Sequence, residues 1–511
     1  MNKLSAGLVF VVLLSAVLYF FQLGAPTLWD QDEGQVLASS LEMVKSGEYL
    51  TPHLNGGIYF HKPPLYAWLT AVLFKVFGFS EFIGRFWTAV FGVAGIALVY
   101  YFARAVFNER AAFLSALMLA VSPLYFVLSK MALVDIFLTF FIMLSMYLFY
   151  LGYKNPGQKK YFFLMYLSMA LGTLAKGPLG LLIPALSIAL FLIIEKKAGF
   201  IKEMVPLKGL LFFILIASPW FIVEAFREGL YFLQMLFGQF LFSIYFTPFQ
   251  QHPGPIYYYI LVALVGFLPW SSIFILSLFK KPPPLLLSVF LVTLLVFSLA
   301  STKVPGYFLP AFPFMAMIAG GYLDKIFNGE DKIGFYFCLT FSLLVLVVTF
   351  FLVSNAVIPA EFSQALVYLQ TIILLAASGF FLAFLFSFIK PNPSWSIGAW
   401  VFSLIILYVG FMVWLVPYAE NFKYSKDLAF AAKEKEHIAF FRTWLPPSFV
   451  FYLNRQQYPT FSTEINDVNK LRSFLSKSNS ACLIPENEEK TISFPHRVIS
   501  KKGGFTIIDT L

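Results

Sequence analysis

Residues 111–150, AAFLSALMLAVSPLYFVLSKMALVDIFLTFFIMLSMYLFY, contain two charged side chains, Lys130 and Asp135, and both lie near the middle of the stretch. The apolar runs on either side, near 111–129 and 132–152, are each long enough to cross about 30 Å of hydrocarbon as a helix. Because lipid offers no partners to backbone N–H and C=O groups, both runs are expected to be helical. The stretch therefore predicts two membrane-spanning helices joined by a short charged connection.

Similar apolar runs recur along the whole chain of 511 residues. Hydrophobic residues make up 59% of it, charged residues only 12%, and the mean hydropathy is +0.79. A soluble globular protein carries roughly 25% charged residues, so this chain has too little polar surface for a water-exposed fold. About thirteen spans are predicted, the first retained rather than cleaved as a signal peptide. They lie near 5–23, 84–103, 111–129, 132–152, 161–175, 178–195, 207–225, 256–279, 284–300, 306–323, 333–354, 364–389 and 395–416.

The basic residues set the orientation of these spans. With the N-terminus inside, every predicted inside loop contains Lys or Arg, as cytoplasmic loops usually do. The net charge of +10 is then a sign of membrane topology, and no nucleic-acid partner is expected. An odd number of spans places the C-terminus on the extracytoplasmic face.

Two domains are predicted, an all-α polytopic membrane domain over residues 1–417 and a small extracytoplasmic α/β domain over 418–511. Charges become dense after Pro417, and Pro and Asn separate short apolar segments there. Within this second domain, residues 426–445 are predicted to form an amphipathic helix. Strands are predicted in FVFYL and GFTIIDTL.

The membrane domain has two long outer loops, about 24–83 and about 226–255. In the first loop, apolar residues over 36–44 and 67–77 recur with helical spacing but do not extend far enough to span a membrane. This pattern predicts helices that lie in the membrane interface.

Ionisable residues outside the cytoplasmic loops gather at the outer ends of the spans. Charges near membrane depth are costly, so each is a candidate for function. A lipid flippase or transporter needs polar groups along a path through the membrane, and this one-sided clustering favours an active site on the outer face instead. The set comprises Asp30, Asp32, Glu33, His61, Lys62, Lys130, Asp135, Lys176, Glu224, Arg227, His252 and Lys303.

Asp32 and Glu33 are the candidate catalytic carboxylates. Either can act as a general base or stabilise developing charge on a sugar. The alternative is that the DQDE sequence caps the helix that follows it. Since neighbours on a helix are about 100° apart, one carboxylate should face the reaction while the other caps or pairs nearby.

Three lysines are candidates for binding a phosphate. Lys62 precedes a Pro-Pro helix start, where a phosphate is well placed, although a Lys there can also extend to the interface without a ligand. Lys176 in AKGP and Lys303 in KVPG repeat a lone Lys at the outer end of a span. Asp135 is a further catalytic candidate, with a structural ion pair to one of these lysines as its alternative.

His61 and His252 are two of five histidines and both fall in outer loops. Together with a carboxylate they could hold a divalent metal such as Zn, Mg or Mn, the alternative being ordinary polar loop residues. No nucleotide-activated donor is available outside the cytoplasm, so no nucleotide cofactor is expected. A transferase there needs a donor that crosses the membrane, such as a sugar on a lipid phosphate.

At these residues the chain resembles the polyprenyl-phosphate-sugar-dependent glycosyltransferases of the GT-C fold. It is most similar to the aminoarabinose lipid A transferase group and more distantly similar to protein O-mannosyltransferases. The resemblance covers most of residues 25–325. Its motifs are LWDQDEG, SGEYLTPHLNGGIYFHKPPLYAWL, LVDIFLTFF, AKGP, QHPGPIYYY, LPW and KVPGYFLPAFP.

The resemblance assigns roles by position. It implies that Asp32 is the main catalytic acidic residue, that Lys62 binds the donor phosphate, that Asp135 supports the site and that Tyr307 lines the phosphate pocket. His252 matches a metal-contacting histidine. Three positions depart from the family pattern, with His61 in place of Glu, Gln35 in place of Arg, and Pro253 in place of a basic residue.

The resemblance implies an inverting glycosyltransferase of the inner (plasma) membrane, with its active site on the periplasmic face. Its donor would be a polyprenyl-phosphate sugar, and its acceptor lipid A or a related glycolipid embedded among membrane lipids. The alternatives are an enzyme that modifies Ser or Thr, as protein O-mannosyltransferases do, and a flippase of lipid-linked sugars.

Overall fold

The computed structural model describes residues 5–235, 238, 252–356, 359, 362–389, 393–454, 460–461 and 464–510. The chain divides into two compact units. Unit 1 comprises Met1–Phe21, His61–Leu65 and Thr88–Leu415, and unit 2 comprises Gln22–Phe60, Tyr66–Trp87 and Val416–Leu511. Unit 2 thus combines most of the first outer loop with the C-terminal segment. The predicted domain boundary after residue 417 stays a prediction.

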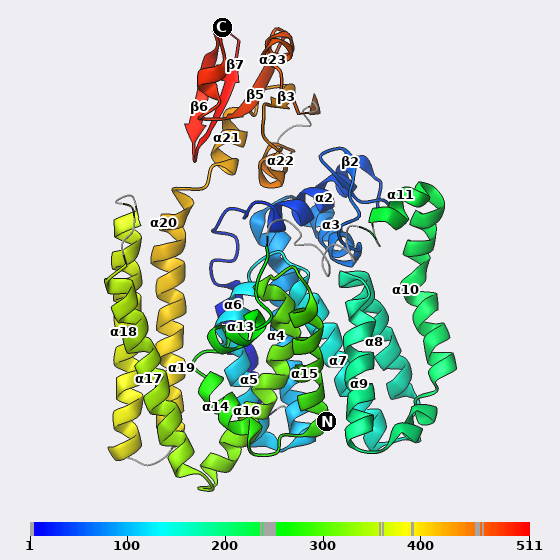
Figure 1. The fold of residues 1–511 in the computed structure, drawn as a ribbon, viewed down its shortest axis with the longest axis vertical. Coiled ribbons are helices and arrows are strands. Elements are labelled where there is room, and N and C mark those ends of the chain that lie inside the picture. Colours follow the sequence, from blue (N-terminus) through cyan, green and yellow to red (C-terminus); the bar gives the residue numbers. More distant parts are fainter. Residues whose placement is uncertain are drawn as a thin grey trace. The chain divides into compact units, whose positions relative to one another are not determined.

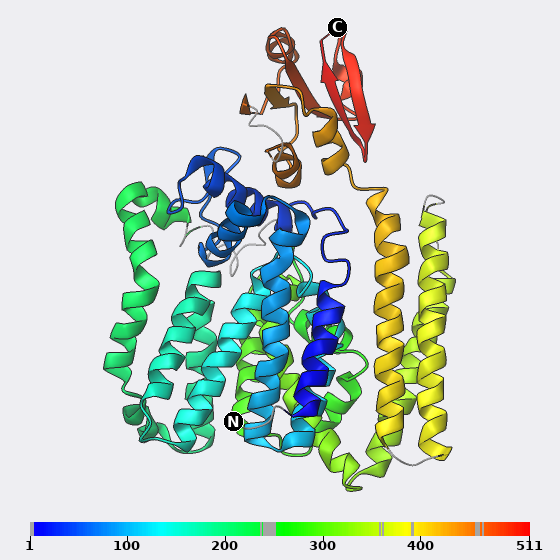
Figure 2. The same ribbon diagram turned by 180° about the vertical axis from the view of Figure 1, so that it is seen from behind.

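Unit 1 is built of apolar helices. Figures 1 and 2 both show α18 and α19 paired along their lengths, and Figure 1 shows α7, α8 and α9 side by side. The helices, of which α4 begins in unit 2, are α1 (Ala6–Phe20), α4 (Glu81–Val106), α5 (Glu109–Ala120), α6 (Pro123–Leu128), α7 (Asp135–Lys154), α8 (Lys160–Lys176), α9 (Leu179–Ile194), α10 (Pro206–Glu228), α11 (Leu230–Leu233), α13 (Tyr258–Gly266), α14 (Ser271–Leu278), α15 (Pro284–Leu299), α16 (Phe312–Phe327), α17 (Lys332–Ser354), α18 (Ser363–Ile389) and α19 (Pro393–Gly410). Shorter turns are η1 (Ala198–Met204), η4 (Pro305–Ala311) and η6 (Phe411–Leu415).

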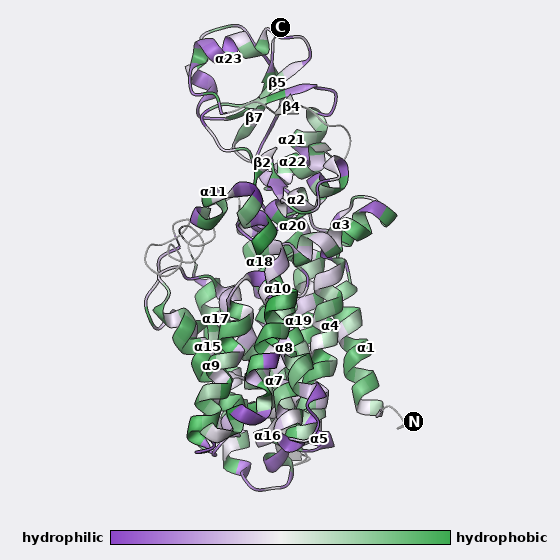
Figure 3. Cartoon of the chain, turned by 90° about the vertical axis from the view of Figure 1, so that its right-hand side faces the viewer, coloured by the Kyte–Doolittle hydropathy of each residue, from purple (hydrophilic) through white to green (hydrophobic). Residues whose placement is uncertain are grey.

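These helices make the chain a multi-pass membrane protein. Among the described residues, 7 helices are individually long and apolar enough to cross a membrane. Figure 3 shows the hydrophobic colouring that follows the helices of unit 1. Within Pro305–Phe327, an 18-residue apolar window is 94% buried in the protein, whereas the corresponding window of Lys332–Ser354 is only 17% buried and leaves its apolar side chains for lipid.

Every interval predicted to span contains helix, but two of the predicted spans are interrupted. The third breaks between α5 and α6, where Pro123 starts a new helix, and the eighth breaks between α13 and α14, near Pro269. Proline lacks the N–H that would continue a helix, which explains both breaks. The count of about thirteen spans stays a prediction.

Unit 2 contains two helices from the first outer loop, α2 (Asp32–Ser46) and α3 (Leu65–Phe77), where the sequence predicts them. A five-stranded sheet has the order β4-β3-β5-β7-β6, with β3 parallel to β4 and β5, and β7 antiparallel to both of its neighbours. The remaining elements are β1 (His53–Leu54), β2 (Gly57–Ile58), α20 (Val416–Glu420), α21 (Ser425–Ala431), β3 (His437–Phe440), α22 (Pro447–Asn454), β4 (Thr460–Phe461), α23 (Val468–Leu475), β5 (Ser480–Pro485), η7 (Glu489–Thr491), β6 (Arg497–Lys502) and β7 (Phe505–Asp509).

Two local predictions for the C-terminal segment were wrong. The helix predicted over 426–445 ends at Ala431, and β3 follows it because Ile438 is buried between two partner strands, β4 and β5. FVFYL forms α22 instead of a strand, because an apolar run is ambiguous and the preceding Pro447 favours a helix start. The strand predicted in GFTIIDTL is confirmed as β7.

Candidate functional site

The turn that precedes α2 has an unusual backbone. Gln31 has φ 65° and ψ −68°, and the N–H of Asp32 donates to the carbonyl of Asp30 across 2.9 Å. These values define the rare positive-φ γ-turn, a strained conformation for a residue with a side chain. Gln31 makes no side-chain cap hydrogen bond to α2. Asp32 and Glu33 nevertheless lie in the first turn of α2, where acidic side chains are favourable, so the capping alternative for the DQDE sequence stays open.

Glu33 is completely buried and paired with Arg85. Arg85 donates to Oε1 through Nε at 2.8 Å and to Oε2 through Nη2 at 2.7 Å. Its remaining N–H groups donate to the carbonyls of Leu23, Pro26 and Thr27. Such a planar two-point pair engages both oxygens of the Glu33 carboxylate within the fold.

Asp32 differs from Glu33 in its exposure and in its contacts. Its side chain is exposed, and among the described residues its carboxylate has no hydrogen-bond or ion-pair partner. Burial first, and the negative charge of Asp32 second, raise the pKa of the Tyr59 phenol. The Tyr59 hydroxyl donates to Gln35 Oε1 at 3.0 Å. Asp32 is thus the carboxylate of the pair that is available for chemistry.

In unit 1, Asp135 and Lys176 form a buried ion pair. Asp135 begins α7, Lys176 ends α8, and Nζ lies 2.5 Å from Oδ1. The same ammonium lies 4.3 Å from the ring centroid of Tyr307. Gly306 lets η4 approach, since a Cβ there would lie 3.2 Å from Asp135 Oδ1. Three motifs that are far apart in the sequence therefore meet around one carboxylate.

Lys303 has its ammonium directed at the C-terminal end of α15. It donates to the carbonyls of Phe297 at 3.1 Å, Ser298 at 2.7 Å and Ala300 at 2.5 Å. An ammonium has three N–H donors, so these carbonyls use all of them. Lys130 makes the equivalent contacts at the end of α1, with the carbonyls of residues 18, 19 and 21. Both lysines stabilise the negative end of a helix.

The backbone of His252 is held beside Lys303. The Lys303 N–H donates to the His252 carbonyl at 2.9 Å, and Pro253 forms a bridge with Thr302. Gly254 makes this approach possible, since a Cβ there would lie 2.6 Å from Lys303 Cγ. The HPGP and KVPG motifs are therefore packed against each other.

His61 and Lys62 are partly buried residues of unit 1. Burial, and then the positive charge of Lys62, lower the pKa of the His61 imidazole and favour its neutral form. Among the described residues, no group of three or more His, Cys, Asp or Glu side chains is arranged to hold a metal ion. His61 and His252 thus have suitable donor atoms without a complete ligand set.

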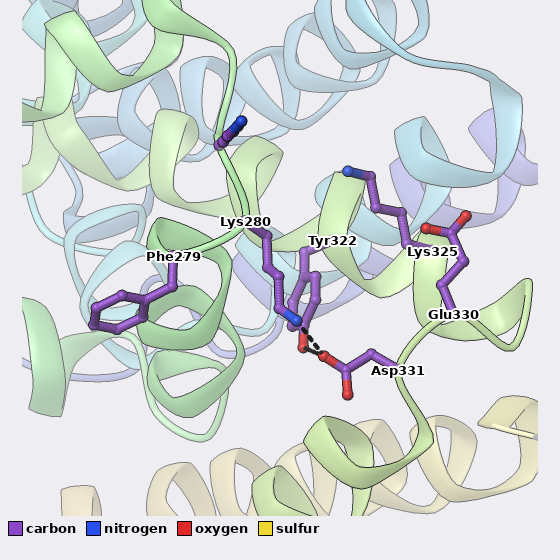
Figure 4. Close-up of a pocket in the computed structure, with 7 residues that line it drawn as sticks. Phe279, Lys280, Tyr322, Lys325, Glu330 and Asp331 are labelled. Carbon is purple, nitrogen blue, oxygen red and sulfur yellow. Dashed lines mark hydrogen bonds and ion pairs between the residues drawn. The ribbon is translucent and has the colours of Figure 1, made fainter.

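A pocket of about 260 Å³ lies elsewhere, among predicted cytoplasmic loops of unit 1 (Figure 4). Lys280 and Tyr322 both bind the Asp331 carboxylate there. The pocket contains none of the predicted site residues. It is lined by Phe279, Lys280, Lys281, Tyr322, Lys325, Glu330 and Asp331.

Sequence reasoning did not identify Arg85 or Tyr59. Arg85 carried a signal, since an arginine at the start of a predicted span is costly unless it is paired. Tyr59 carried none, because its proximity to Asp32 depends on how the first outer loop folds. The turn at Gln31 was equally invisible in the sequence.

Comparisons with known proteins agree with these motifs. The sequence profile of the dolichyl-phosphate-mannose-protein mannosyltransferase family matches residues 61–223. An uncharacterized protein of Aquifex aeolicus is 31% identical over 320 residues, which are 62% of this chain and 73% of that protein. The undecaprenyl phosphate-alpha-4-amino-4-deoxy-L-arabinose arabinosyl transferase of Yersinia enterocolitica is 27% identical over 338 residues. That match covers 63% of this chain and 60% of the enzyme, less than two thirds of its length.

Solved structures show the same fold over nearly the whole chain. ArnT from Cupriavidus metallidurans, bound to undecaprenyl phosphate, superposes with a TM-score of 0.83 at 21% identity and covers 98% of this chain and 97% of its own. The oligosaccharyltransferase AglB from Archaeoglobus fulgidus superposes with a TM-score of 0.52 at 13% identity, over 95% of this chain and 69% of its own.

Proposed function

The chain belongs to the GT-C glycosyltransferases that include the undecaprenyl phosphate aminoarabinose transferases, and from that premise we propose that it moves a sugar from a polyprenyl phosphate to an outer-leaflet acceptor. Lipid A or a related glycolipid is the proposed acceptor. Support comes from the Yersinia enterocolitica relative, an undecaprenyl phosphate-linked arabinosyl transferase, and from ArnT, whose structure contains undecaprenyl phosphate.

The proposed reaction is an inverting substitution at the anomeric carbon. The acceptor oxygen forms the new bond to that carbon, the bond to the phosphate oxygen breaks, and polyprenyl phosphate leaves with the electron pair. Asp32 accepts the proton of an acceptor hydroxyl or stabilises positive charge on the sugar. A phosphate acceptor is already anionic and needs little help from a base.

The observation that carries this proposal is the different state of the two neighbouring carboxylates. Glu33 is buried in its pair with Arg85, while Asp32 is exposed. A general base must be able to reach a substrate, and only Asp32 meets that condition. Glu33, the other candidate carboxylate, acts in this proposal by holding the loop that bears Asp32.

Lys62 is the proposed main contact for the donor phosphate, as a cation that neutralises the leaving group. Lys176, Lys303 and Tyr307 are proposed as further phosphate contacts, with Asp135 supporting them. In the present structure Lys176 pairs with Asp135 and Lys303 with carbonyl groups. A phosphate must therefore displace those partners before either lysine can bind it.

Mass spectrometry of lipid A and of glycoproteins, from cells with and without the gene, tests the function. Loss of a sugar from lipid A on deletion supports the proposal. Loss from protein Ser or Thr instead supports the second candidate, an enzyme like the protein O-mannosyltransferases, which the match over residues 61–223 favours. Unchanged lipid A and unchanged glycoproteins contradict both.

We further propose that the C-terminal segment and the reaction lie on the periplasmic side of the inner membrane, as the basic inside loops predict. Ser478 is exposed between α23 and β5, and both native cysteines are buried, so Ser478→Cys offers one reactive thiol. An impermeant maleimide should label this variant in intact spheroplasts. Labelling that requires lysis contradicts the orientation.

A divalent metal held by His61 and His252 is a separate proposal. The neutral imidazole of His61 is a suitable ligand, and water or substrate would complete the set. The reaction described above does not depend on it. Elemental analysis of purified wild type and His252→Ala decides the matter, and a metal-free wild type refutes the proposal.

A further inference from the structure

The loop that bears Asp32 is held by residues from the far end of the chain, all within unit 2. The Asp30 carboxylate accepts hydrogen bonds from Ser425 through Oδ2 at 2.9 Å and from Ser448 through Oδ1. Both serines are buried, with 4% and 0% of their surfaces exposed. Two buried hydroxyl groups are therefore committed to one carboxylate of the DQDE sequence.

The residues just before Asp30 are held by the same segment. The Leu28 N–H donates to the Tyr452 hydroxyl at 2.7 Å, and the Thr27 hydroxyl donates to Glu420 Oε2 at 2.6 Å. Lys423 donates to the Thr27 carbonyl at 2.8 Å. Hydrogen bonds to backbone groups fix the path of the chain and not only the positions of side chains.

The residue after Glu33 is also packed against the C-terminal segment. A Cβ on Gly34 would lie 2.6 Å from the backbone nitrogen of Ser448, so α2 and α22 approach as closely as glycine allows. Between these fixed points lies the γ-turn at Gln31, whose strained backbone needs support from its surroundings. Asp32 is the acidic residue of DQDE left exposed by this arrangement.

We propose that the C-terminal segment positions the catalytic carboxylate, with Asp30, Ser425 and Ser448 as positioning residues that keep the γ-turn formed and Asp32 directed outward. This inference rests on the proposed function of Asp32. The three acidic residues of DQDE then have separate tasks: Asp30 anchors the loop to the C-terminal segment, Asp32 reacts, and Glu33 joins the loop to α4.

The test uses the full-length protein with both hydroxyl groups removed, Ser425→Ala/Ser448→Ala. Turnover should fall about tenfold or more, since small displacements of a reacting group have large effects, while KM for the donor stays within about twofold. The single variant Ser448→Thr keeps the hydroxyl group, so it should turn over like the wild type. Ser480→Ala is the matched control, because among the described residues the hydroxyl of this buried serine donates only to the nearby carbonyls of Leu475 and Lys477.

A second comparison separates positioning from general destabilisation. If Asp30 acts only through Asp32, Asp30→Asn should slow the wild type but should not slow Asp32→Asn any further. A further loss in that background overturns the inference. So does wild-type turnover in the double serine variant.

A readout without activity keeps the inference testable if the wild type transfers no sugar. Amide hydrogen exchange over residues 28–34 should speed up in the double serine variant and stay unchanged in Ser480→Ala. Unchanged exchange in the double variant refutes the anchoring. An inactive wild type with faster exchange in the variant refutes only the proposed function.

Discussion

Two aspartates each begin a helix, one in each unit, and their surroundings are opposite. Asp32 begins α2 in unit 2 and is exposed after a strained turn. Asp135 begins α7 in unit 1, is 8% exposed, and pairs with Lys176. Each lies in the first turn of its helix, where the positive end of the helix favours a carboxylate. That common benefit cannot explain the difference, so the rest of the environment decides what each carboxylate does.

The difference separates an accessible carboxylate from one that is buried in an ion pair. A buried carboxylate whose lysine partner lies 2.5 Å away has its charge neutralised in place. A carboxylate exposed on a strained loop gains nothing comparable from the fold. A strained backbone conformation is costly to maintain, and such conformations cluster at functional sites.

The largest expected effect is on turnover at Asp32. Asp32→Asn keeps the size of the side chain, so the protein should fold normally but lose roughly 10²–10⁴-fold in rate. Glu33→Gln should instead lower the thermal stability, because the variant leaves the charge of Arg85 buried and unpaired. Turnover and melting temperature of both purified variants in detergent check this.

The reverse result would reverse the assignment. An active Asp32→Asn beside a stable but inactive Glu33→Gln would make Glu33 the catalytic residue. If both variants turn over like the wild type, the reaction must use other residues, and Asp135 and Lys176 become the first candidates.

The next largest effect should be a loss of folding stability when Asp135 is replaced. Asp135→Asn leaves the Lys176 ammonium buried without its counter-charge, which costs about 3–5 kcal/mol. The double variant Asp135→Leu/Lys176→Met removes both charges and should regain most of that stability. Thermal denaturation of the single and double variants measures the coupling between the two residues. A single variant that is as stable as wild type yet inactive would show that Asp135 serves the reaction.

Smaller effects on donor binding and on stability should distinguish Lys62 from Lys303. Lys62→Ala should cost on the order of 1.5–3 kcal/mol of donor binding, seen as a higher KM for the donor. Lys303→Ala should remove the cap of α15, costing about 1 kcal/mol of stability, and should raise the KM for the donor less than Lys62→Ala does, because Lys303 is only a further phosphate contact. Kinetics with varied donor concentration, together with melting curves, separate the two. Unchanged donor kinetics in Lys62→Ala would refute its phosphate role.

How far the sequence could predict this site depends on the range of each interaction. Helix geometry alone requires Asp32 and Glu33 to diverge, and the structure shows them doing so. The partner of Glu33 lies 52 residues away, and no local pattern pairs Glu33 with Arg85. The cap at Lys303 could have been predicted from the sequence, because its carbonyl partners lie only 3 to 6 residues earlier.

The membrane helices were predicted well because apolar length is a local property that the bilayer enforces. The C-terminal segment was predicted less well, since its elements depend on sheet partners. Ile438 is in a strand because β4 and β5 lie on either side of it, although residues 426–445 have a helical pattern. The anchoring of Asp30 by Ser425 and Ser448 joins positions 395 and 418 residues apart, so no local pattern of composition or spacing could predict it.

A third aspartate at a helix start, Asp331, should show the smallest effect. It caps α17 by accepting from the Gly334 N–H at 2.8 Å, and Lys280 lies 2.9 Å away. Hydrogen bonding from Lys280, first, and from Gly334 lowers the pKa of Asp331 from 3.8 to about 2. A carboxyl with a lower pKa in the folded state stabilises the protein above its unfolded value and loses that contribution as the pH falls toward 2. Because the pair is partly exposed, Asp331→Asn, which keeps the cap, should cost only about 0.5 kcal/mol at neutral pH. Melting curves of variant and wild type should therefore differ slightly at pH 7 and converge near pH 2 to 3. A loss as large as that expected for Asp135→Asn would show that burial is not what separates the structural aspartates.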